Sequence, residues 1–454
     1  MSHINLVEVK LNLYNMRIGI IIGRIGGLDG VALETEKWIE VLWRMGHEVH
    51  LLAGQIEMRN PDKKYESLLP VLSFFSPECL YEQSKAFYHP DLDPKPLIDQ
   101  LELTSDIIAK EIVWWALGNR IDLIITENAC ALPSHISMGM GIRKAVNHIG
   151  LKAITHDHDY AWERGTRYLS RHRQINQIIA DTFPLKAENV RRAVINKNAQ
   201  KDLKEKFGYE SIVVPNVMDF QVEYGTKRPQ NALLRSDLGI AEDDIMLAQI
   251  TRIVRRKGIE TAIELVHKLD NPKVKLVITG NYNDDNDGEY SRILMEKIRD
   301  FQLENQVIFA AKFLQENFTE TDKVERKYSL SDIYAQADAC TYFSTYEGFG
   351  NAFVEAVLAK KPIFVNNYIP VFWPDIGSLG FDVVMLEDNQ LTNEKVDEIK
   401  AVLADKNRQL EIAEFNFNLG KKYFSYDALS EKLSLLLKLS LDDYRKRLKN
   451  TLNL

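Results

Sequence analysis

The stretch RIGIIIGRIGGLDG, residues 17–30, decides the fold class of this chain. Its first half is a nearly continuous apolar run that ends in glycine, which is typical of a parallel strand buried on both faces. Apolar residues then recur at helical spacing from Val31 to Met45, Gly46 ends that helix, and Glu48–Ala53 forms a second apolar run. A strand, a glycine turn, a helix and a second strand make a βαβ unit, so the sequence predicts a doubly wound α/β sheet.

Two such series of strands and helices follow one another along the chain. The pattern weakens at Gln221–Asn231, which we interpret as a linker between a domain at 1–222 and a domain at 230–419. Further strands are predicted at 122–126, 152–155, 177–180 and 212–214, and then at 245–250, 275–279, 307–309, 339–343, 362–365 and 381–385. Two doubly wound domains predict a cleft between them, and ligands of such sheets bind just beyond the carboxyl ends of strands.

Composition excludes several classes of protein. The chain has 454 residues, of which 45% are hydrophobic and 27% charged, so it is neither a disordered chain nor a fibre. Its 57 basic and 65 acidic residues give a net charge of −8, and attraction to nucleic acid is not expected. No apolar run approaches the roughly 20 residues that span a bilayer, and the three cysteines have no disulfide or zinc spacing. We therefore expect a cytoplasmic protein without a membrane span or a nucleic-acid partner.

The glycine turn after the first strand is a candidate anion site. Gly26 and Gly27 let the backbone approach a ligand closely, and the N-terminus of the next helix attracts negative charge. The turn lacks the GxGxxG pattern, and Gln55 rather than an acidic residue follows the second strand, which disfavours a nicotinamide-dependent dehydrogenase. A plain strand-to-helix turn is the alternative interpretation.

Four ionisable residues, His156 to Asp159, follow the strand predicted at 152–155. Such residues are costly at a strand end unless they face solvent or a ligand. Either Asp157 and Asp159 form a DxD metal motif, or His156 projects toward a substrate and donates a hydrogen bond. The basic run at 164–173 that follows is either a solvated helix face or an anchor for an anionic acceptor.

The second series carries a basic loop at the end of a strand. Arg252, Arg255, Arg256 and Lys257 follow the strand predicted at 245–250, and Gly258 opens the next helix. Cations at a strand end and a helix start predict a diphosphate site. The alternative is a basic surface loop.

The stretch EGFGNAFVE, residues 347–355, pairs two glutamates across a glycine-rich loop and the following helix. Eight helical positions span about 12 Å at ~1.5 Å per residue. That separation suits one carboxylate on a hexose and the other on a ribose, with a diphosphate at the helix N-terminus between them. A carboxylate would repel the diphosphate itself, so hydroxyl groups are the expected partners of Glu347 and Glu355.

Residues 347–355 resemble the E-x7-E motif of glycosyltransferase family 4, which contains retaining enzymes with two Rossmann-like domains in the arrangement called GT-B. Residues 16–54 resemble the family's first strand, glycine loop and helix, and residues 277–280 resemble its strand before the nucleotide pocket. Pro215–Asp219 resembles the end of its first domain, although Val217 stands where glycine is usual. The resemblance covers most of the chain and implies that C-terminal helices within 420–454 cross back to the first domain.

The resemblance also implies a role for each site residue. Arg252 and Lys257 would neutralise the leaving diphosphate, Glu347 would hold hydroxyls of the donor sugar, and His156 would contact that sugar, so these four are the expected catalytic residues. The implied donor-binding set is Gly26, Gly27, Arg252, Lys257, Glu347, Gly348, Phe349, Gly350, Asn351 and Glu355. The expected acceptor-binding set is Asp29, His158, Arg164 and Arg167. No metal ligand and no required cofactor are expected.

The implied activity is that of a retaining hexosyltransferase. It would move a hexose from a nucleotide diphosphate sugar, of the GDP-mannose or UDP-glucose type, to a hydroxyl of a small anionic or phosphorylated sugar. Residues 29–38 also resemble a subgroup that includes mannosylglucosyl-3-phosphoglycerate synthase. The alternatives are a nucleotide-sugar epimerase on the same fold, a metal-dependent transferase built on Asp157 and Asp159, and a non-catalytic sugar-binding protein.

Overall fold

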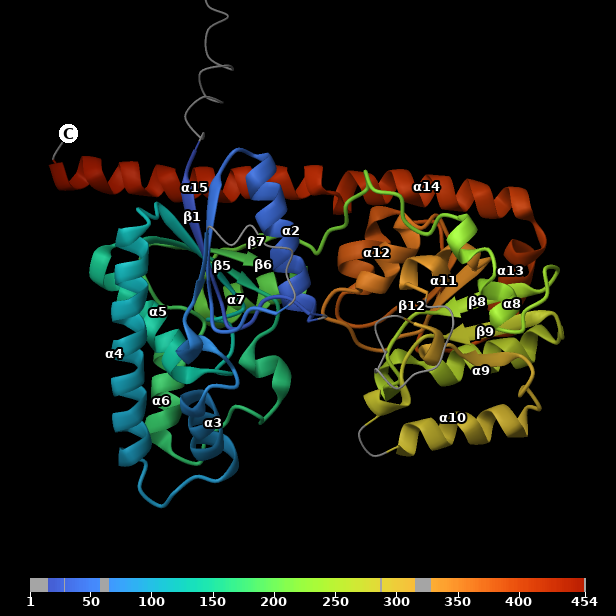
Figure 1. Cartoon of the computed structure of the whole chain (residues 1–454), viewed down its shortest axis with the longest axis horizontal. Coiled ribbons are helices and arrows are strands. Elements are labelled where there is room, and N and C mark those ends of the chain that lie inside the picture. The colour runs from blue at the N-terminus through green and yellow to red at the C-terminus, as the bar shows by residue number, and fades with distance from the viewer. Residues whose placement is uncertain (1–14, 28, 58–64, 286–287, 315–327, 453–454) are drawn as a thin grey trace, which may run out of the picture. The chain divides into compact units, whose positions relative to one another are not determined.

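The structure is a computed structural model that describes residues 15–27, 29–57, 65–285, 288–314 and 328–452 (Figure 1). The chain forms two compact units. The N-terminal unit contains residues 1–216 together with 426–454, and the C-terminal unit contains residues 217–425.

The division falls between Asn216 and Val217, ahead of the segment interpreted as a linker. That segment belongs to the C-terminal unit because its polar groups bind helix α11, Leu330–Gln336. The Gly225 amide donates to the Ser331 hydroxyl at 2.9 Å, and the Asn231 side chain donates to Asp332 at 2.9 Å. The polar residues of this stretch therefore anchor it to helix α11, so it is not a free linker.

The described part of the N-terminal unit contains a parallel sheet of seven strands in the order β3-β2-β1-β4-β5-β6-β7. The strands are β1 Arg17–Ile22, β2 Glu48–Ala53, β3 Glu66–Leu68, β4 Leu123–Glu127, β5 Lys152–Asp157, β6 Val190–Val194 and β7 Ile212–Val213. The helices are α2 Gly30–Arg44, α3 Pro77–Gln83, α4 Lys95–Gly118, α5 Ile136–Ile149, α6 Arg173–Thr182, α7 Lys197–Phe207 and α15 Tyr426–Leu452. The strand order reverses between β1 and β4, which makes that place a topological switch point.

Helices α4 and α5 run side by side in this unit (Figure 1). Ile108 and Ile112 of α4 and Ile142 of α5 share a buried cluster with Ile21 and Ile124 of the sheet. Helix α15 lies against α2, β5 and β6. The last helix of the chain therefore completes the unit that the first strand begins.

The C-terminal unit has six parallel strands among its described residues, in the order β10-β9-β8-β11-β12-β13. They are β8 Ile245–Gln249, β9 Val274–Ile278, β10 Val307–Phe309, β11 Ala339–Tyr342, β12 Ile363–Asn366 and β13 Val384–Leu386. The further helices are α8 Leu234–Asp237, α9 Ile259–Leu269, α10 Glu289–Asp300, α12 Asn351–Leu358, α13 Asn393–Ala404 and α14 Lys406–Phe424. The switch point of this sheet lies between β8 and β11.

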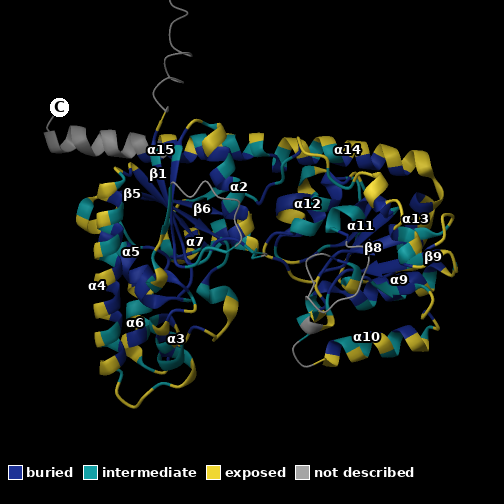
Figure 2. Ribbon diagram, viewed as in Figure 1, coloured by how far each residue is buried: buried dark blue, intermediate teal, exposed yellow. Residues whose placement is uncertain are grey.

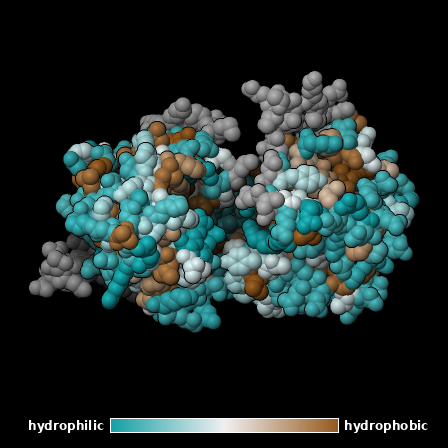
Figure 3. Space-filling view, turned by 90° about the horizontal axis from the view of Figure 1, so that it is seen from below, coloured by the Kyte–Doolittle hydropathy of each residue, from teal (hydrophilic) through white to brown (hydrophobic). Residues whose placement is uncertain are grey.

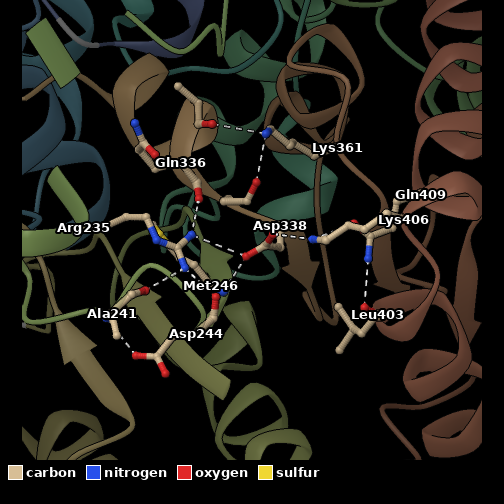
Figure 4. A network of polar contacts seen from close by, with 12 residues as sticks. Arg235, Ala241, Asp244, Met246, Gln336, Asp338, Lys361, Leu403, Lys406 and Gln409 are labelled. Atoms are coloured by element: carbon tan, nitrogen blue, oxygen red, sulfur yellow. Dashed lines mark hydrogen bonds and ion pairs between the residues drawn. The ribbon is translucent and has the colours of Figure 1, made fainter. Parts of the chain in front are cut away.

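A network of polar contacts holds the amino ends of β8 and β11 (Figure 4). Asp338 accepts a hydrogen bond from the Met246 amide at 2.8 Å and from Lys406 of α14 at 2.8 Å, and it lies 3.4 Å from the Arg235 guanidinium. Burial alone would raise the pKa of Asp338, but these donors outweigh it and lower the pKa. The network ties α8 and α14 to the end of the sheet opposite the switch-point loops.

Most strands are buried in both units, whereas the edge strands β3 and β7 are partly exposed and the helices expose one side (Figure 2). The surface in Figure 3 is mostly hydrophilic with scattered apolar patches. Among the described residues of the whole chain, exposed apolar side chains include Leu92 and Trp114. No described helix is long and apolar enough to cross a membrane. The cysteines Cys79, Cys130 and Cys340 are buried and unpaired.

The strand predicted at 177–180 is wrong, because these residues belong to α6. Ile175, Ile178 and Ile179 follow helical spacing and pack into one apolar cluster. Strand β6 is not predicted because two arginines interrupt its apolar pattern. One of them, Arg192, is buried with its guanidinium 3.8 Å from the centre of the Tyr209 ring.

Strand β3 is likewise not predicted from the sequence. The other predicted strands are present, with ends that shift by up to three residues. The predicted class, α/β with two doubly wound parallel sheets, is confirmed.

Candidate active site

The loop between β8 and α9 is fixed to both strands at the switch point. Gly258 ends the loop at φ +60°, and a Cβ there would lie 2.0 Å from the Phe343 carbonyl oxygen, so the position requires glycine. The Gln249 amide donates to the Lys257 carbonyl at 3.1 Å, and its oxygen accepts from the Thr341 hydroxyl at 2.6 Å. The basic residues are thus carried by a rigid turn.

Two cations of this loop hold Glu347. Lys257 Nζ donates to Oε1 of Glu347, and Arg256 Nη1 donates to Oε2 at 2.7 Å. Glu347 is 7% exposed and Lys257 is 9% exposed. Burial would raise the pKa of Glu347, but Lys257 and Arg256 outweigh it and lower the pKa. Burial lowers the pKa of Lys257 by more than Glu347 raises it. The result is a charged cluster in which Lys257 and Glu347 have little access to solvent and Arg256 is partly exposed.

The remaining two cations of the loop have different surroundings. Arg255 pairs with Glu289 at 2.8 Å. The Arg252 side chain is exposed and makes no hydrogen bond or ion pair with the described residues. The loop beside it is held by Asp284, which accepts from the Ile253 amide at 3.1 Å. Arg252 is therefore the cation of this loop that is open to an anionic ligand.

The turn from Glu347 into α12 brings a helix N-terminus to the same switch point. Gly350 has φ +121°, and a Cβ there would lie 2.1 Å from Tyr368 Oη. Tyr368 donates to the Phe349 carbonyl at 3.0 Å, which fixes the turn. Helix α12 starts at Asn351 without a side-chain cap. Such a helix end favours a bound anion.

Glu355 lies further along α12 and is partly exposed. The buried Tyr334 hydroxyl donates to Glu355 Oε2 at 3.2 Å, and it also lies within hydrogen-bond reach of the Ala352 carbonyl at 3.3 Å. The hydroxyl thus holds the carboxylate on one side of the helix. Both glutamates of the motif are fixed by contacts within the C-terminal unit, and their ligand roles stay predictions.

The glycine turn of the N-terminal unit is enclosed by its own chain. Gly26 has φ +89° and Gly27 has φ +68°. A Cβ on Gly26 would lie 1.6 Å from the Glu57 carbonyl oxygen, and one on Gly27 would lie 3.1 Å from Glu57 Oε2. Gly26 is therefore required by close approach of the chain itself, and Gly27 is favoured by its positive φ. The nearby carboxylate would repel a phosphate at this turn, and the predicted donor contacts stay untested.

Asp29 caps helix α2. Its Oδ1 accepts from the Val31 amide at 3.1 Å and from the Ala32 amide at 3.0 Å. Its Oδ2 accepts from Arg24 at 3.3 Å. Both oxygens thus have a structural role that is independent of the predicted acceptor contact.

The two aspartates of the possible DxD motif bind different partners. Asp157 is buried and accepts from the Thr155 hydroxyl at 2.9 Å and from the Tyr160 hydroxyl at 3.0 Å. Asp159 instead accepts from the Asn128 amide at 2.9 Å and pairs with Arg164. Neither aspartate belongs to a cluster of metal-ligating side chains among the described residues. The geometry therefore disfavours a DxD metal site.

His156 lies in the interior of the N-terminal unit. Its side chain is 0% exposed, and its ring stacks on Trp38 with centroids 3.9 Å apart. The side chain therefore does not project from the strand end into solvent, and its predicted contact with a sugar stays a prediction. His158 is nearer the surface, with a side chain 9% exposed.

The predicted acceptor arginines are both exposed. Arg164 pairs with Asp159, whereas the Arg167 guanidinium lies 5.3 Å from the centre of the Tyr168 ring. Of the two, Arg167 is free of an acidic partner in the described residues.

Two residues of these clusters are not singled out by the sequence: Glu127 beside His156 and Tyr334 on Glu355. Arg256 belongs to the predicted basic loop, but its pairing with Glu347 is not predicted. An acidic residue directly after the strand predicted at 122–126 is the pattern that could have indicated Glu127. Nothing in the sequence marks Tyr334, because its partner is 21 residues away.

Comparison with known proteins extends over nearly the whole chain. Residues 230–418 match the family described as glycosyl transferases group 1. Mannosylglucosylglycerate synthase of Thermotoga maritima is 31% identical over 438 residues, 92% of this chain and 99% of that protein. The protein of the same name from Petrotoga mobilis is 30% identical over 439 residues, 90% of this chain and 98% of that protein.

A solved glycosyltransferase from Rickettsia africae covers 94% of this chain and 99% of its own, with a TM-score of 0.63 at 13% identity. That likeness concerns the fold and agrees with the predicted GT-B class. The sequence relatives decide the family, since they align from end to end at 30% identity or above. This chain therefore belongs to the glycosyl transferases of group 1 and is a glycosyltransferase.

Proposed function

We propose that this chain is a retaining hexosyltransferase of glycosyltransferase family 4 that transfers mannose from a nucleotide diphosphate mannose to glucosylglycerate or its phosphorylated form. The names of its two relatives support the sugar and the acceptor. Those names do not say which nucleotide the donor carries. Of the two donor types expected from the sequence, GDP-mannose contains the proposed sugar and is tested first, and UDP-glucose is tested second. The buried, unpaired cysteines fit a reducing cytoplasm.

The observation that carries the donor part of the proposal is the charge at the β8–β11 switch point. Arg252, Arg256 and Lys257 against Glu347 give a net charge of 3 − 1 = +2. Helix α12 adds its positive end. Fixed positive groups of this kind stabilise the negative charge that develops on a leaving diphosphate.

Glu347 has a second role in this proposal. In the structure its two oxygens pair with Lys257 and Arg256. A bound diphosphate would compete for Lys257 and release one oxygen of Glu347, which then accepts hydrogen bonds from hydroxyls of the donor sugar. Glu355, oriented by Tyr334, would hold the ribose.

The acceptor would be bound through its negative charge. Arg167 and, after release from Asp159, Arg164 supply cations at the surface of the N-terminal unit. Retention of configuration would follow from attack on the same face of the sugar as the leaving diphosphate, through an oxocarbenium-like state. This route requires no protein nucleophile.

Thermal unfolding with GDP, UDP and ADP tests the donor site. A ligand at about 100 times its dissociation constant stabilises a protein by roughly 2.7 kcal/mol. We expect GDP to raise the unfolding temperature most, and Arg252→Ala to reduce that shift. Arg299→Ala, on α10 and away from the loop, is the matched control. No shift with any diphosphate would refute the donor site.

Turnover tests the reaction itself. GDP-mannose and glucosylglycerate should give GDP and a mannosylated product whose anomeric configuration, read by NMR, matches that of the donor. The phosphorylated acceptor should be compared at equal concentration. Loss of donor without an acceptor would favour an epimerase, and an inverted product would refute the retaining mechanism.

A further inference from the structure

The carboxyl ends of β4 and β5 bring three metal-ligating side chains together. Glu127 ends β4, His156 lies next to the end of β5, and His158 follows that strand. Glu127 and His156 are direct partners in the parallel register of the two strands. The site belongs to the N-terminal unit alone and shares no residue with the cation cluster around Glu347.

The distances within this group fit shared coordination. Each of the three side chains offers one ligand atom, and these atoms all lie within 4.8 Å of one another. His156 Nδ1 lies 2.8 Å from Glu127 Oε2, and His158 Nε2 lies 3.8 Å from the same oxygen. Ligands of a tetrahedral zinc ion at about 2.0–2.1 Å from the metal lie about 3.3 Å apart. To reach that spacing, the hydrogen-bonded Glu127 and His156 atoms would separate by about 0.5 Å, and His158 would approach Glu127 by about the same distance.

The group contains polar atoms that nothing in the protein satisfies. His156 Nε2, His158 Nε2 and Glu127 Oε1 are buried and have no hydrogen-bond partner. His156 and Glu127 are at most 1% exposed. Buried polar atoms are rarely left unpaired, because each costs free energy. An ion bound to His158 Nε2, to Glu127 and to one nitrogen of His156 would remove most of that cost.

The surroundings hold the ligands in place, as the outer partners of metal ligands do. Trp38 stacks on the His156 ring at 3.9 Å and 20°. The Asn128 side chain accepts from the His158 amide at 3.1 Å and fixes the backbone there. The side chain of His158 is the one that reaches toward solvent, so an ion would enter past it.

We propose that Glu127, His156 and His158 form a binding site for a transition-metal ion of the zinc type. Two imidazole nitrogens and one carboxylate oxygen suit Zn²⁺, Co²⁺ or Ni²⁺. They do not suit Mg²⁺ or Ca²⁺, which prefer oxygen ligands. The ion would tie the ends of β4 and β5 together and set the position of His158. It is not the diphosphate-binding metal of a DxD motif, since neither Asp157 nor Asp159 takes part.

Metal binding to the full-length chain, without an affinity tag, tests the proposal. After treatment with a chelator, Co²⁺ should give visible d–d absorption that saturates at one equivalent, and Zn²⁺ should displace it whereas Mg²⁺ should not. X-ray absorption of the zinc-loaded protein should show two imidazoles and a carboxylate. Absence of the Co²⁺ absorption, or displacement by Mg²⁺ as efficient as by Zn²⁺, would refute the site.

Substitutions locate the ion. His158→Gln and Glu127→Gln should each weaken Zn²⁺ binding by at least tenfold, which is about the smallest effect of losing a supporting partner. His148→Gln, at an exposed histidine of α5, is the matched control and should leave binding unchanged. Equal affinity of wild type and His158→Gln would overturn the assignment. The GDP shift, measured in parallel, separates this result from the fate of the proposed function.

Discussion

Replacing Lys257 with methionine should destabilise the C-terminal unit through the charge that it leaves behind. The Lys257 and Glu347 side chains are only 11% and 9% exposed. Removing one partner of a buried pair costs about 3–5 kcal/mol. Arg256 still holds the second oxygen of Glu347 at 2.7 Å, although it is 37% exposed, so we expect a cost at or below the lower end, about 2–3 kcal/mol.

The cost can be read as a shift in unfolding temperature. The C-terminal unit spans 425 − 216 = 209 residues. For a domain of this size, 1 kcal/mol corresponds to about 2–4 °C, so Lys257→Met should lower its transition by roughly 4–12 °C. Circular dichroism of the full chain measures this. Lys360→Met is the matched control, because Lys360 pairs with Glu414 at the surface and both side chains are about half exposed.

A double variant measures the interaction energy between Lys257 and Glu347. Glu347→Gln in the Lys257→Met background removes the orphaned charge, so the double variant should be more stable than Lys257→Met alone. The coupling should be about 1–3 kcal/mol, typical of contacting charged residues. Two outcomes would refute the reasoning: a shift for Lys257→Met no larger than that of the surface control, or effects of the two substitutions that simply add.

Three further predictions follow from the same site. The difference in the free energy of unfolding between wild type and Glu347→Gln should shrink as the pH falls below 4.5, the ordinary pKa of a glutamate. The reason is that a pKa lowered by folding gives stability that is present above the ordinary pKa and is lost on protonation. A constant difference in urea unfolding across the pH series would contradict this. Gly350→Ala should destabilise the protein by more than Gly380→Ala, because both glycines have positive φ but only the new Cβ at 350 meets an atom, Tyr368 Oη at 2.1 Å; equal thermal shifts would show that φ alone decides. Arg252→Ala should leave the unfolding temperature within error, because the Arg252 side chain is exposed and forms no ion pair with the described residues. The same substitution should lower kcat/KM by about 10²–10³, the usual effect of losing one group that stabilises developing charge. Near-normal turnover would remove Arg252 from the mechanism.

Local sequence patterns were sufficient to predict most strands of the two sheets. Apolar runs at 17–22 and 48–53 predict β1 and β2 because buried parallel strands need no long-range information to be recognised. The same argument fails at 177–180, where a short apolar run suits a strand or a helix equally, and at β6, where Arg192 is buried against Tyr209. In both cases the contact that decides comes from elsewhere in the chain.

The sequence by itself determined the two doubly wound series, the glycine turns at the strand ends, and the order of Arg252, Lys257, Glu347 and Glu355 along the chain. These features depend on short-range periodicity and backbone sterics, which are written in neighbouring residues. Only the tertiary structure decided that Lys257 neutralises Glu347 across 90 positions and that His156 is buried beside Glu127. Burial and charge pairing are set by which strands lie side by side, because the energy of a polar group depends on the groups that folding places around it.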